Sequence, residues 1–272
     1  MNVQIKELRH AFGAKTVLNG ISFEIKEGEI FSLIGPNGAG KTTTLRCLYG
    51  DIVWDGGTIL LNGQKVSSKL KEKIAVVTEN RFSFSRFTGE DHVKLWKALY
   101  PSWDEKVFGS FFTHYNFELQ ARADTYSMGW KTLLNLALAL SSGADLLILD
   151  EPTQNLDPLV RQEVLNILHT FVEREGKTII ISSHEIFELE EITSSFAILK
   201  EGDILYTDHL DDAKEKHRIV NQEEKVSYGE VIGLVKNETL IRTEQEVGRY
   251  PTFQEIILGY LQGKKHFLPF SR

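Results

Sequence analysis

The chain has 272 residues, enough for one large domain and a smaller addition. Hydrophobic residues make up 42% and charged residues 25%, the balance of an ordinary globular protein. The net charge of −7 argues against nucleic acid as the main partner, and no run reaches the ~18–20 apolar residues that a membrane-spanning helix needs. The single cysteine, Cys47, excludes an internal disulfide framework and fits a reducing compartment.

The amino-terminal part has the pattern of short strands. Hydrophobic residues alternate from Val3 to Leu8 and from Ile21 to Ile25, and an apolar strand is predicted from Ile30 to Ile34. Two further short strands are predicted from Thr58 to Leu61 and from Ile74 to Val77, with turn sequences between them.

A glycine-rich loop follows the predicted strand Ile30 to Ile34, and a helical run from Thr43 to Tyr49 follows the loop. The loop has the form GxxxxGK[ST], in which glycines let successive N–H groups point at one anion. Lys41 adds a charge for the outer phosphates, and the Thr42 hydroxyl is the expected Mg²⁺ ligand. The motif predicts a nucleoside triphosphate site. Its members are Gly35, Asn37, Gly38, Ala39, Gly40, Lys41, Thr42 and Thr43.

From about residue 80 the composition becomes rich in aromatic side chains, and thirteen of them lie between Phe82 and Trp130. A helix start is indicated at Ser102, which has Glu105 three residues later as in a capping box. We expect a helical subdomain over about residues 80–143.

Strands and helices alternate beyond this subdomain. Leu146 to Leu149 and Thr178 to Ser182 are apolar runs too short for helices, and apolar residues recur at helical spacing from Val160 to Val172. This alternation predicts a parallel sheet with helices on its faces. We expect a main domain over residues 1–215 and a small α+β extension over 216–272.

Two acids, Asp150 and Glu151, end the strand Leu146 to Leu149. An unpaired carboxylate at the edge of a core is costly, so this pair indicates a site. In a phosphate-loop enzyme the first acid holds the Mg²⁺ shell and the second polarises the attacking water. The alternative is a helix cap before Pro152.

The ordered set of motifs resembles the nucleotide-binding subunits of ATP-binding cassette (ABC) transporters over residues 1 to about 215. The phosphate loop, Asp150-Glu151, Asn155-Leu156-Asp157-Pro158 and Ser183-His184 follow in that family's order and spacing. The resemblance implies an α/β fold: a P-loop NTPase core with an antiparallel β subdomain and an inserted helical subdomain.

Ser127-Met128-Gly129 stands where that family carries its signature Leu-Ser-Gly-Gly-Gln. The resemblance implies that Ser127 and Gly129 contact the γ-phosphate held by the opposite subunit. Met128 and Trp130 depart from the signature. The residues alone also fit a capped, buried helix that starts at Ser127.

The family's pattern assigns roles to three more residues. His184 would position the attacking water, although Ser182 and Glu185 also have the spacing of a helix cap. Phe12 would stack on adenine, with a hydrophobic contact near a strand end as the alternative. Asp157 would lie where two subunits meet.

Glu79 is the clearest departure from the family. It stands where the family has a glutamine whose oxygen contacts Mg²⁺, so we expect Thr42, Glu79 and Asp150 around the metal. The alternative is a surface glutamate in a loop. The resemblance further implies that Lys41, Glu151 and His184 are the catalytic residues.

The implied function is ATP hydrolysis that powers transport, with export favoured, through separate transmembrane permease subunits. Two ATPase subunits, identical or different, would pack head to tail at the inner, cytoplasmic face of the cell membrane, with ATP and Mg²⁺ bound and no nucleic acid. Aromatic residues between Phe82 and Trp103 are expected to form part of the permease-docking surface. The alternative is that most of them fill the core of the helical subdomain, which we expect for over half of them. The alternatives are a regulatory subunit with little turnover, a soluble cassette ATPase outside transport, and a phosphate-loop kinase.

Overall fold

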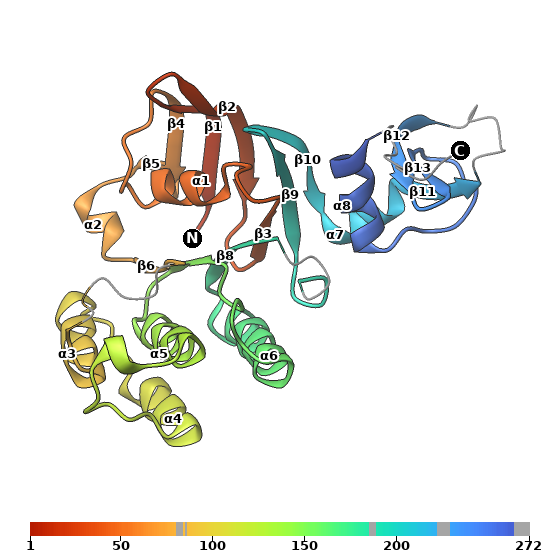
Figure 1. The fold of residues 1–272 in the computed structure, drawn as a ribbon. Helices are drawn as coiled ribbons and strands as arrows, with labels where there is room; N and C mark the ends of the chain where they lie inside the picture. The colour runs from red at the N-terminus through yellow and green to blue at the C-terminus, as the bar shows by residue number, and fades with distance from the viewer. Residues whose placement is uncertain (80–83, 85, 185–188, 222–228, 264–272) are drawn as a thin grey trace.

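The computed structural model describes residues 1–79, 84, 86–184, 189–221 and 229–263. An antiparallel sheet near the amino terminus has the strand order β2-β1-β4-β5, which confirms the predicted antiparallel subdomain (Figure 1). Its strands are β1 (Val3–Phe12), β2 (Lys15–Ile25), β4 (Gly56–Leu61) and β5 (Gln64–Lys65).

The central sheet has six strands in the order β10-β9-β3-β8-β7-β6. All neighbouring pairs are parallel except β10 and β9. The carboxyl ends of parallel strands meet at one edge, which is where such sheets bind ligands. The strands are β3 (Ile30–Ile34), β6 (Ile74–Val77), β7 (Leu146–Asp150), β8 (Thr178–Ser183), β9 (Ser195–Lys200) and β10 (Asp203–His209).

The two faces of the central sheet belong to different hydrophobic cores. In β3, Ile30 and Ile34 pack with the large helices, whereas Phe31 and Leu33 pack with α1 and the antiparallel sheet. Successive side chains of a strand point to opposite faces, so a strand buried on both faces is apolar at nearly every position. This explains the short apolar runs of the sequence.

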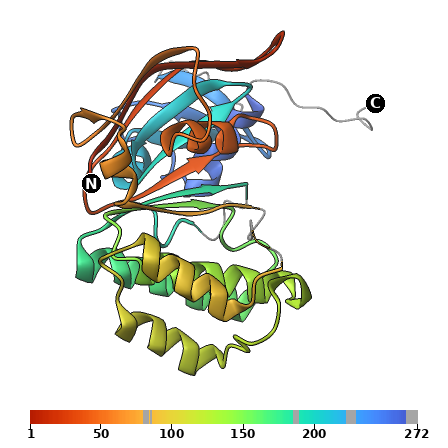
Figure 2. The same cartoon turned by 90° about the vertical axis from the view of Figure 1, so that its left-hand side faces the viewer.

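Helices cover both faces of the central sheet. Helix α1 (Lys41–Leu48) lies between the two sheets, and the larger helices lie below the central sheet (Figures 1 and 2). None of the described helices is long and apolar enough to cross a membrane. The remaining helices up to residue 175 are α2 (Ser68–Lys71), α3 (Gly89–Leu99), α4 (Glu105–Tyr115), a 3₁₀ turn (Ala123–Thr125), α5 (Met128–Ser141) and α6 (Pro158–Glu175).

Two predicted helix starts were wrong. Helix α1 begins at Lys41, two residues before Thr43, because Gly40 already turns the chain into the helix. Helix α4 is capped by Asp104 and not by Ser102: the Asp104 carboxylate accepts hydrogen bonds from two N–H groups of the first turn. Glu105 is therefore the first residue of the helix, and no capping box with Ser102 forms.

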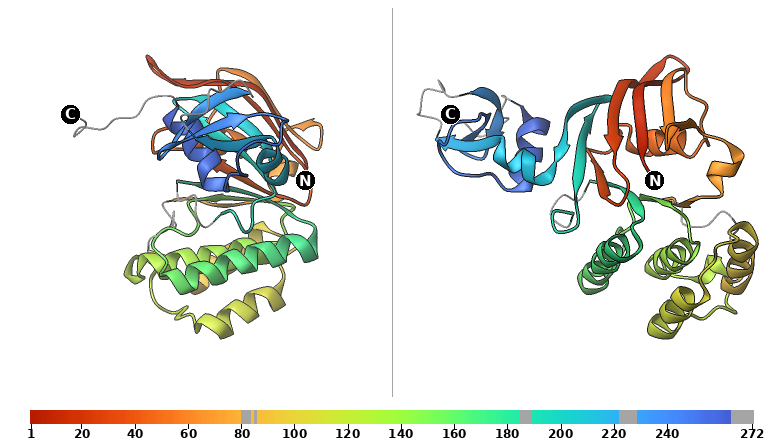
Figure 3. Two further views of the ribbon diagram at one scale, coloured as in Figure 1. Left: turned by 90° about the vertical axis from the view of Figure 1, so that its right-hand side faces the viewer. Right: turned by 180° about the vertical axis from the view of Figure 1, so that it is seen from behind.

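The C-terminal part carries a separate three-stranded antiparallel sheet with order β11-β13-β12, beside the central sheet (Figure 3). Its elements are α7 (Leu210–Glu215), β11 (His217–Asn221), β12 (Glu230–Val235), β13 (Glu238–Arg242) and α8 (Phe253–Gln262). Helix α7 ends at Glu215, and His217 already belongs to β11. Phe253 and Tyr260 of α8 pack against Phe196 and Tyr206 of the central sheet, which joins the two parts.

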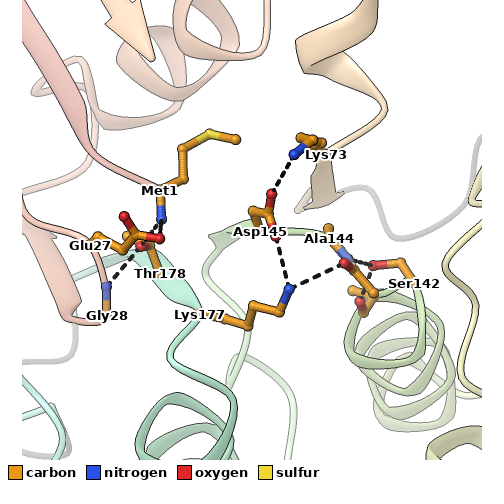
Figure 4. Close-up of polar contacts among 11 residues, drawn as sticks. Met1, Glu27, Gly28, Lys73, Ser142, Ala144, Asp145, Lys177 and Thr178 are labelled. Atoms are coloured by element: carbon orange, nitrogen blue, oxygen red, sulfur yellow. Dashed lines mark hydrogen bonds and ion pairs between the residues drawn. The ribbon is translucent and has the colours of Figure 1, made fainter. Parts of the chain in front are cut away.

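Ion pairs link the amino-terminal ends of three strands of the central sheet, at the edge opposite their carboxyl ends. Asp145 accepts hydrogen bonds from Lys73 at 3.1 Å and Lys177 at 2.9 Å, so that the starts of β6, β7 and β8 are linked (Figure 4). The amino group of Met1 donates to the Thr178 hydroxyl at 2.8 Å in the same view. These contacts fix strand ends opposite to those that carry the predicted site residues.

Candidate active site

The loop between β3 and α1 needs glycine at both ends. A Cβ atom at Gly35 would lie 2.1 Å from the carbonyl oxygen of Leu199, and Gly40 has a φ of 113°, in the left-handed region. The loop can therefore pass close to β9 and turn sharply into α1. The positive end of α1 faces the loop, which favours an anion there.

Lys41 is buried at the start of α1. Its ammonium donates to the carbonyl oxygens of Gly35 at 2.7 Å and Pro36 at 3.4 Å, and it lies 3.6 Å from a carboxylate oxygen of Glu151. The pKa of Lys41 is lowered because burial removes the ammonium from water, an effect that the Glu151 carboxylate partly offsets. A buried ammonium group in this position favours the binding of a polyanion.

The two acids lie at the carboxyl end of β7 and are both buried. Asp150 accepts a hydrogen bond from the hydroxyl of Ser182. Glu151 has a φ of 51°, a left-handed conformation that is uncommon for a residue other than glycine. The acids do not cap a helix: α6 begins only at Pro158, and its cap is Asp157.

His184 follows β8, and its Nδ1 lies 2.9 Å from a carboxylate oxygen of Glu151. The Glu151 carboxylate therefore has Lys41 on one side and His184 on the other. The proposed helix cap by Ser182 was wrong, because Ser182 lies inside β8; its expected partner, Glu185, lies outside the described residues.

A cavity of about 440 Å³ brings most of the predicted residues together at this edge of the sheet. Its lining also includes Lys15, Val17 and Gln154, which the sequence did not point to. Lys15 pairs with Phe12 across the hairpin of β1 and β2, a pairing that the short turn Gly13-Ala14 could have predicted. The predicted residues in the lining are Phe12, Asn37, Gly38, Gly40, Lys41, Thr42, Thr43, Glu79, Glu151 and His184.

Ser127, Gly129 and Asp157 lie around a different cavity, of about 560 Å³. Ser127 caps α5 by accepting a hydrogen bond from the N–H of Trp130, and Asp157 caps α6. Within one chain, the structure does not bring these residues to the cavity that holds Lys41.

A phosphate loop, a buried lysine and an acid flanked by histidine at the edge of a parallel sheet define a phosphate-loop ATPase. The family described as ABC transporter matches residues 18–154. The lantibiotic transport ATP-binding protein SrtF of Streptococcus pyogenes is 30% identical over 222 residues, which cover 81% of this chain and 96% of that protein. The Nod factor export ATP-binding protein I of Paraburkholderia xenovorans (strain LB400) is 34% identical over 215 residues, which cover 74% and 68% of the two chains.

A solved ATP-binding subunit of an ABC transporter superimposes with a TM-score of 0.71 at 27% identity, covering 79% of this chain and 92% of that one. The chain belongs to the ABC transporter family. It is an ATP-binding and ATP-hydrolysing subunit of such a transporter, as the order of the motifs predicted.

Proposed function

We propose that this ATPase powers export through separate transmembrane permease subunits, bound at the inner face of the cell membrane. The convergence of Lys41, Glu151 and His184 on one cavity supports the ATPase part of this proposal, because it joins phosphate binding to activation of water. The transport and export named for the two relatives favour this direction. Residues 1–215 would form the ATP-binding domain and residues 216–272 a small α+β extension.

The residues of the cavity divide the chemistry between them. The loop N–H groups and Lys41 hold the phosphates, and the half-exposed Phe12 ring offers a flat face to adenine. Glu151 orients the attacking water and accepts its proton, while His184 holds the Glu151 carboxylate toward the γ-phosphate. Lys41, Glu151 and His184 are held in position because they lie in or directly after α1, β7 and β8, which belong to the core.

The residues also fit Mg²⁺, which would supply charge for the phosphate oxygens. Mg²⁺ in nucleotide sites binds one or two carboxylates together with phosphates. Thr42 and Glu79 both line the cavity, and the Asp150 carboxylate lies at the end of β7 next to Glu151. Within the described part of the chain, no group of three His, Cys, Asp or Glu residues could hold a metal by itself. Nucleotide phosphates and water would complete the Mg²⁺ shell.

Glu79 tests this metal assignment. Replacing it with Gln should preserve turnover and make the rate less dependent on free Mg²⁺. Without the metal, the Glu79 carboxylate would repel the triphosphate and the two acids, and a neutral amide would not. ATPase rates against free Mg²⁺ would be compared for the parent, Glu79→Gln and the surface control Glu72→Gln. Superimposable curves for all three proteins would remove Glu79 from the metal shell.

A second copy would complete each site. Leu159 is 84% exposed beside Asp157, and Met128 is 44% exposed between Ser127 and Gly129. Exposed apolar side chains next to helix starts suit a surface that a partner covers. In a two-fold dimer, Ser127 and Gly129 of one copy would close over the nucleotide of the other.

An aromatic groove near Glu79 suits a short segment of the permease. The groove has a volume of about 300 Å³ and lies between α3 and the carboxyl end of β6. Phe84 is 47% exposed on its rim, and Thr78, directly before Glu79, forms part of its wall. A permease segment in the groove would contact Thr78, which is linked by one peptide bond to Glu79 of the nucleotide cavity. Movement at one site could therefore be transmitted directly to the other. The lining residues are Tyr49, Val76, Thr78, Phe84, His92, Leu95, Trp96, Leu99, Tyr100 and Asn135.

Only part of the aromatic run between Phe82 and Trp103 faces this groove. Phe82 lies outside the described residues. Trp96, Tyr100 and Trp103 are half-buried against the helical core, so their rings also stabilise the subdomain. Phe84 is the better probe of docking.

Phe84→Ala should weaken binding of a co-expressed permease about tenfold and leave ATP binding unchanged, because it removes an exposed aromatic anchor. Phe112→Ala is the matched control, since Phe112 is 40% exposed on α4 and away from the groove. Co-purification, permease affinity and the unfolding temperature would be measured for both. Loss of stability in Phe84→Ala with unchanged permease affinity would contradict docking at this groove.

Turnover and co-purification also test the function as a whole. The export proposal expects that a permease binds the subunit and raises its ATPase rate. An enzyme that hydrolyses ATP but binds no membrane protein would instead favour a soluble cassette ATPase.

A further inference from the structure

Ser182 is fully buried next to both acids of the active site. It lies in β8 directly opposite Asp150 of β7 in the parallel pairing. Its hydroxyl donates to the Asp150 carboxylate, and the same oxygen accepts the N–H of Glu151 at 3.2 Å. The carbonyl oxygen of Ser182 lies 3.1 Å from that N–H and accepts it as well.

The directions of these hydrogen bonds are fixed by chemistry. A serine hydroxyl has one proton, and an ionised carboxylate can only accept, so the proton points to Asp150. The lone pairs of the hydroxyl then face the N–H of Glu151. A chain results from the Glu151 amide through the Ser182 hydroxyl to the Asp150 carboxylate, in which a charged acceptor at one end strengthens the other bond.

The Glu151 amide is held by two acceptors of Ser182, the hydroxyl oxygen and the carbonyl oxygen. A left-handed backbone is unfavourable for a non-glycine residue, so the surroundings must hold it. With a φ of 51°, Glu151 directs its carboxylate between two neighbours. Oε1 lies 3.6 Å from Lys41 Nζ, and Oε2 lies 2.9 Å from His184 Nδ1. Without the hydroxyl, the amide would keep its bond to the Ser182 carbonyl oxygen but lose the second acceptor, and the turn would be held less tightly.

We propose that Ser182 is a positioning residue that aligns Asp150 and Glu151 with each other. Through one hydroxyl it orients the carboxylate assigned to Mg²⁺ and holds the backbone turn that places the base for water. Because Ser182 is fully buried, it would act through the two acids and not on the substrate itself. The inference depends on the proposed roles of Asp150 and Glu151.

Ser182→Ala should lower kcat for ATP hydrolysis about tenfold, and raise the half-saturating free Mg²⁺ severalfold, because outer-shell partners tune both metal affinity and rate. The KM for ATP should change less than about twofold, since phosphate binding depends on Lys41 and the loop. Ser32→Ala is the matched control: Ser32 is equally buried in β3 and bonds the Thr193 hydroxyl at 2.6 Å, away from the acids. It should keep kcat within about twofold of the parent.

A second pair of variants isolates the hydroxyl from its volume. Ser182→Thr and Ser182→Val have the same shape, and only threonine keeps the hydrogen bonds. The Thr variant should turn over ATP about tenfold faster than the Val variant even where both unfold at a lower temperature. Equal kcat for this pair, or for Ser182→Ala and Ser32→Ala, would overturn the positioning role.

Asp150→Asn and Glu151→Gln separate this inference from the function on which it depends. If both lose turnover while Ser182→Ala matches its control, only the role of Ser182 fails. If both keep turnover, the assigned roles of the acids fail and the inference fails with them.

Discussion

ATP hydrolysis should fall at least about a hundredfold in Glu151→Gln, while ATP remains bound. Gln has the size of Glu and can keep the left-handed turn and the contact with His184. Its amide cannot take a proton from water, so the activated nucleophile is lost. The Glu151 carboxylate lies between Lys41 and His184, at the one place in the described site where a base is held by two neighbours.

The same variant should trap a dimer when ATP is added, because the closed form no longer proceeds to ADP. Light scattering would report the mass with and without ATP, and nucleotide binding would be measured in parallel. Glu29→Gln is the control, since Glu29 is equally buried but lies near the start of β3. Turnover above about a tenth of the parent rate would contradict the role of Glu151. Such a rate would mean that the substitution raises the activation barrier by less than roughly 1.4 kcal/mol.

Lys41→Ala should weaken ATP binding about a hundredfold, on the order of 3 kcal/mol, because charged hydrogen bonds to phosphate in a buried site are strong. The ammonium of Lys41 is buried and is held by two loop carbonyls, so its position is set before ATP arrives. Binding of a fluorescent ATP analogue would give the affinity.

Lys15→Ala provides the comparison within the same cavity. Lys15 lines the cavity but lies on the exposed hairpin, where water screens its charge. Its loss should weaken ATP binding only a few-fold. If Lys41→Ala and Lys15→Ala weakened ATP binding equally, the cavity would bind phosphate through its net charge and not through the specific position of Lys41.

Local features of the sequence predicted the parts of the site that depend on neighbouring residues. The loop from Gly35 to Thr43 has its glycines at the spacing of a phosphate-binding loop, and the acids after Leu149 mark the end of a buried strand. The alternation of short apolar runs with helical spacing predicted the parallel sheet. The structure explains why these runs are apolar throughout, because a strand buried on both faces cannot alternate. The positions of these motifs along the chain were enough to indicate the family.

Contacts between distant segments were decided only by the tertiary structure. No pattern in the sequence places Ser182 opposite Asp150, because the register of β7 and β8 is set by the packing of whole strands. Helix α4 is capped by Asp104 and not by the predicted Ser102, because the chain packs on α5 at this point. The Asp104 N–H donates to the carbonyl oxygen of Ser141 there. The sequence by itself thus determined which residues end the strands. The pairing of those strands determined which residues meet, since the free energy of pairing depends on segments far apart along the chain.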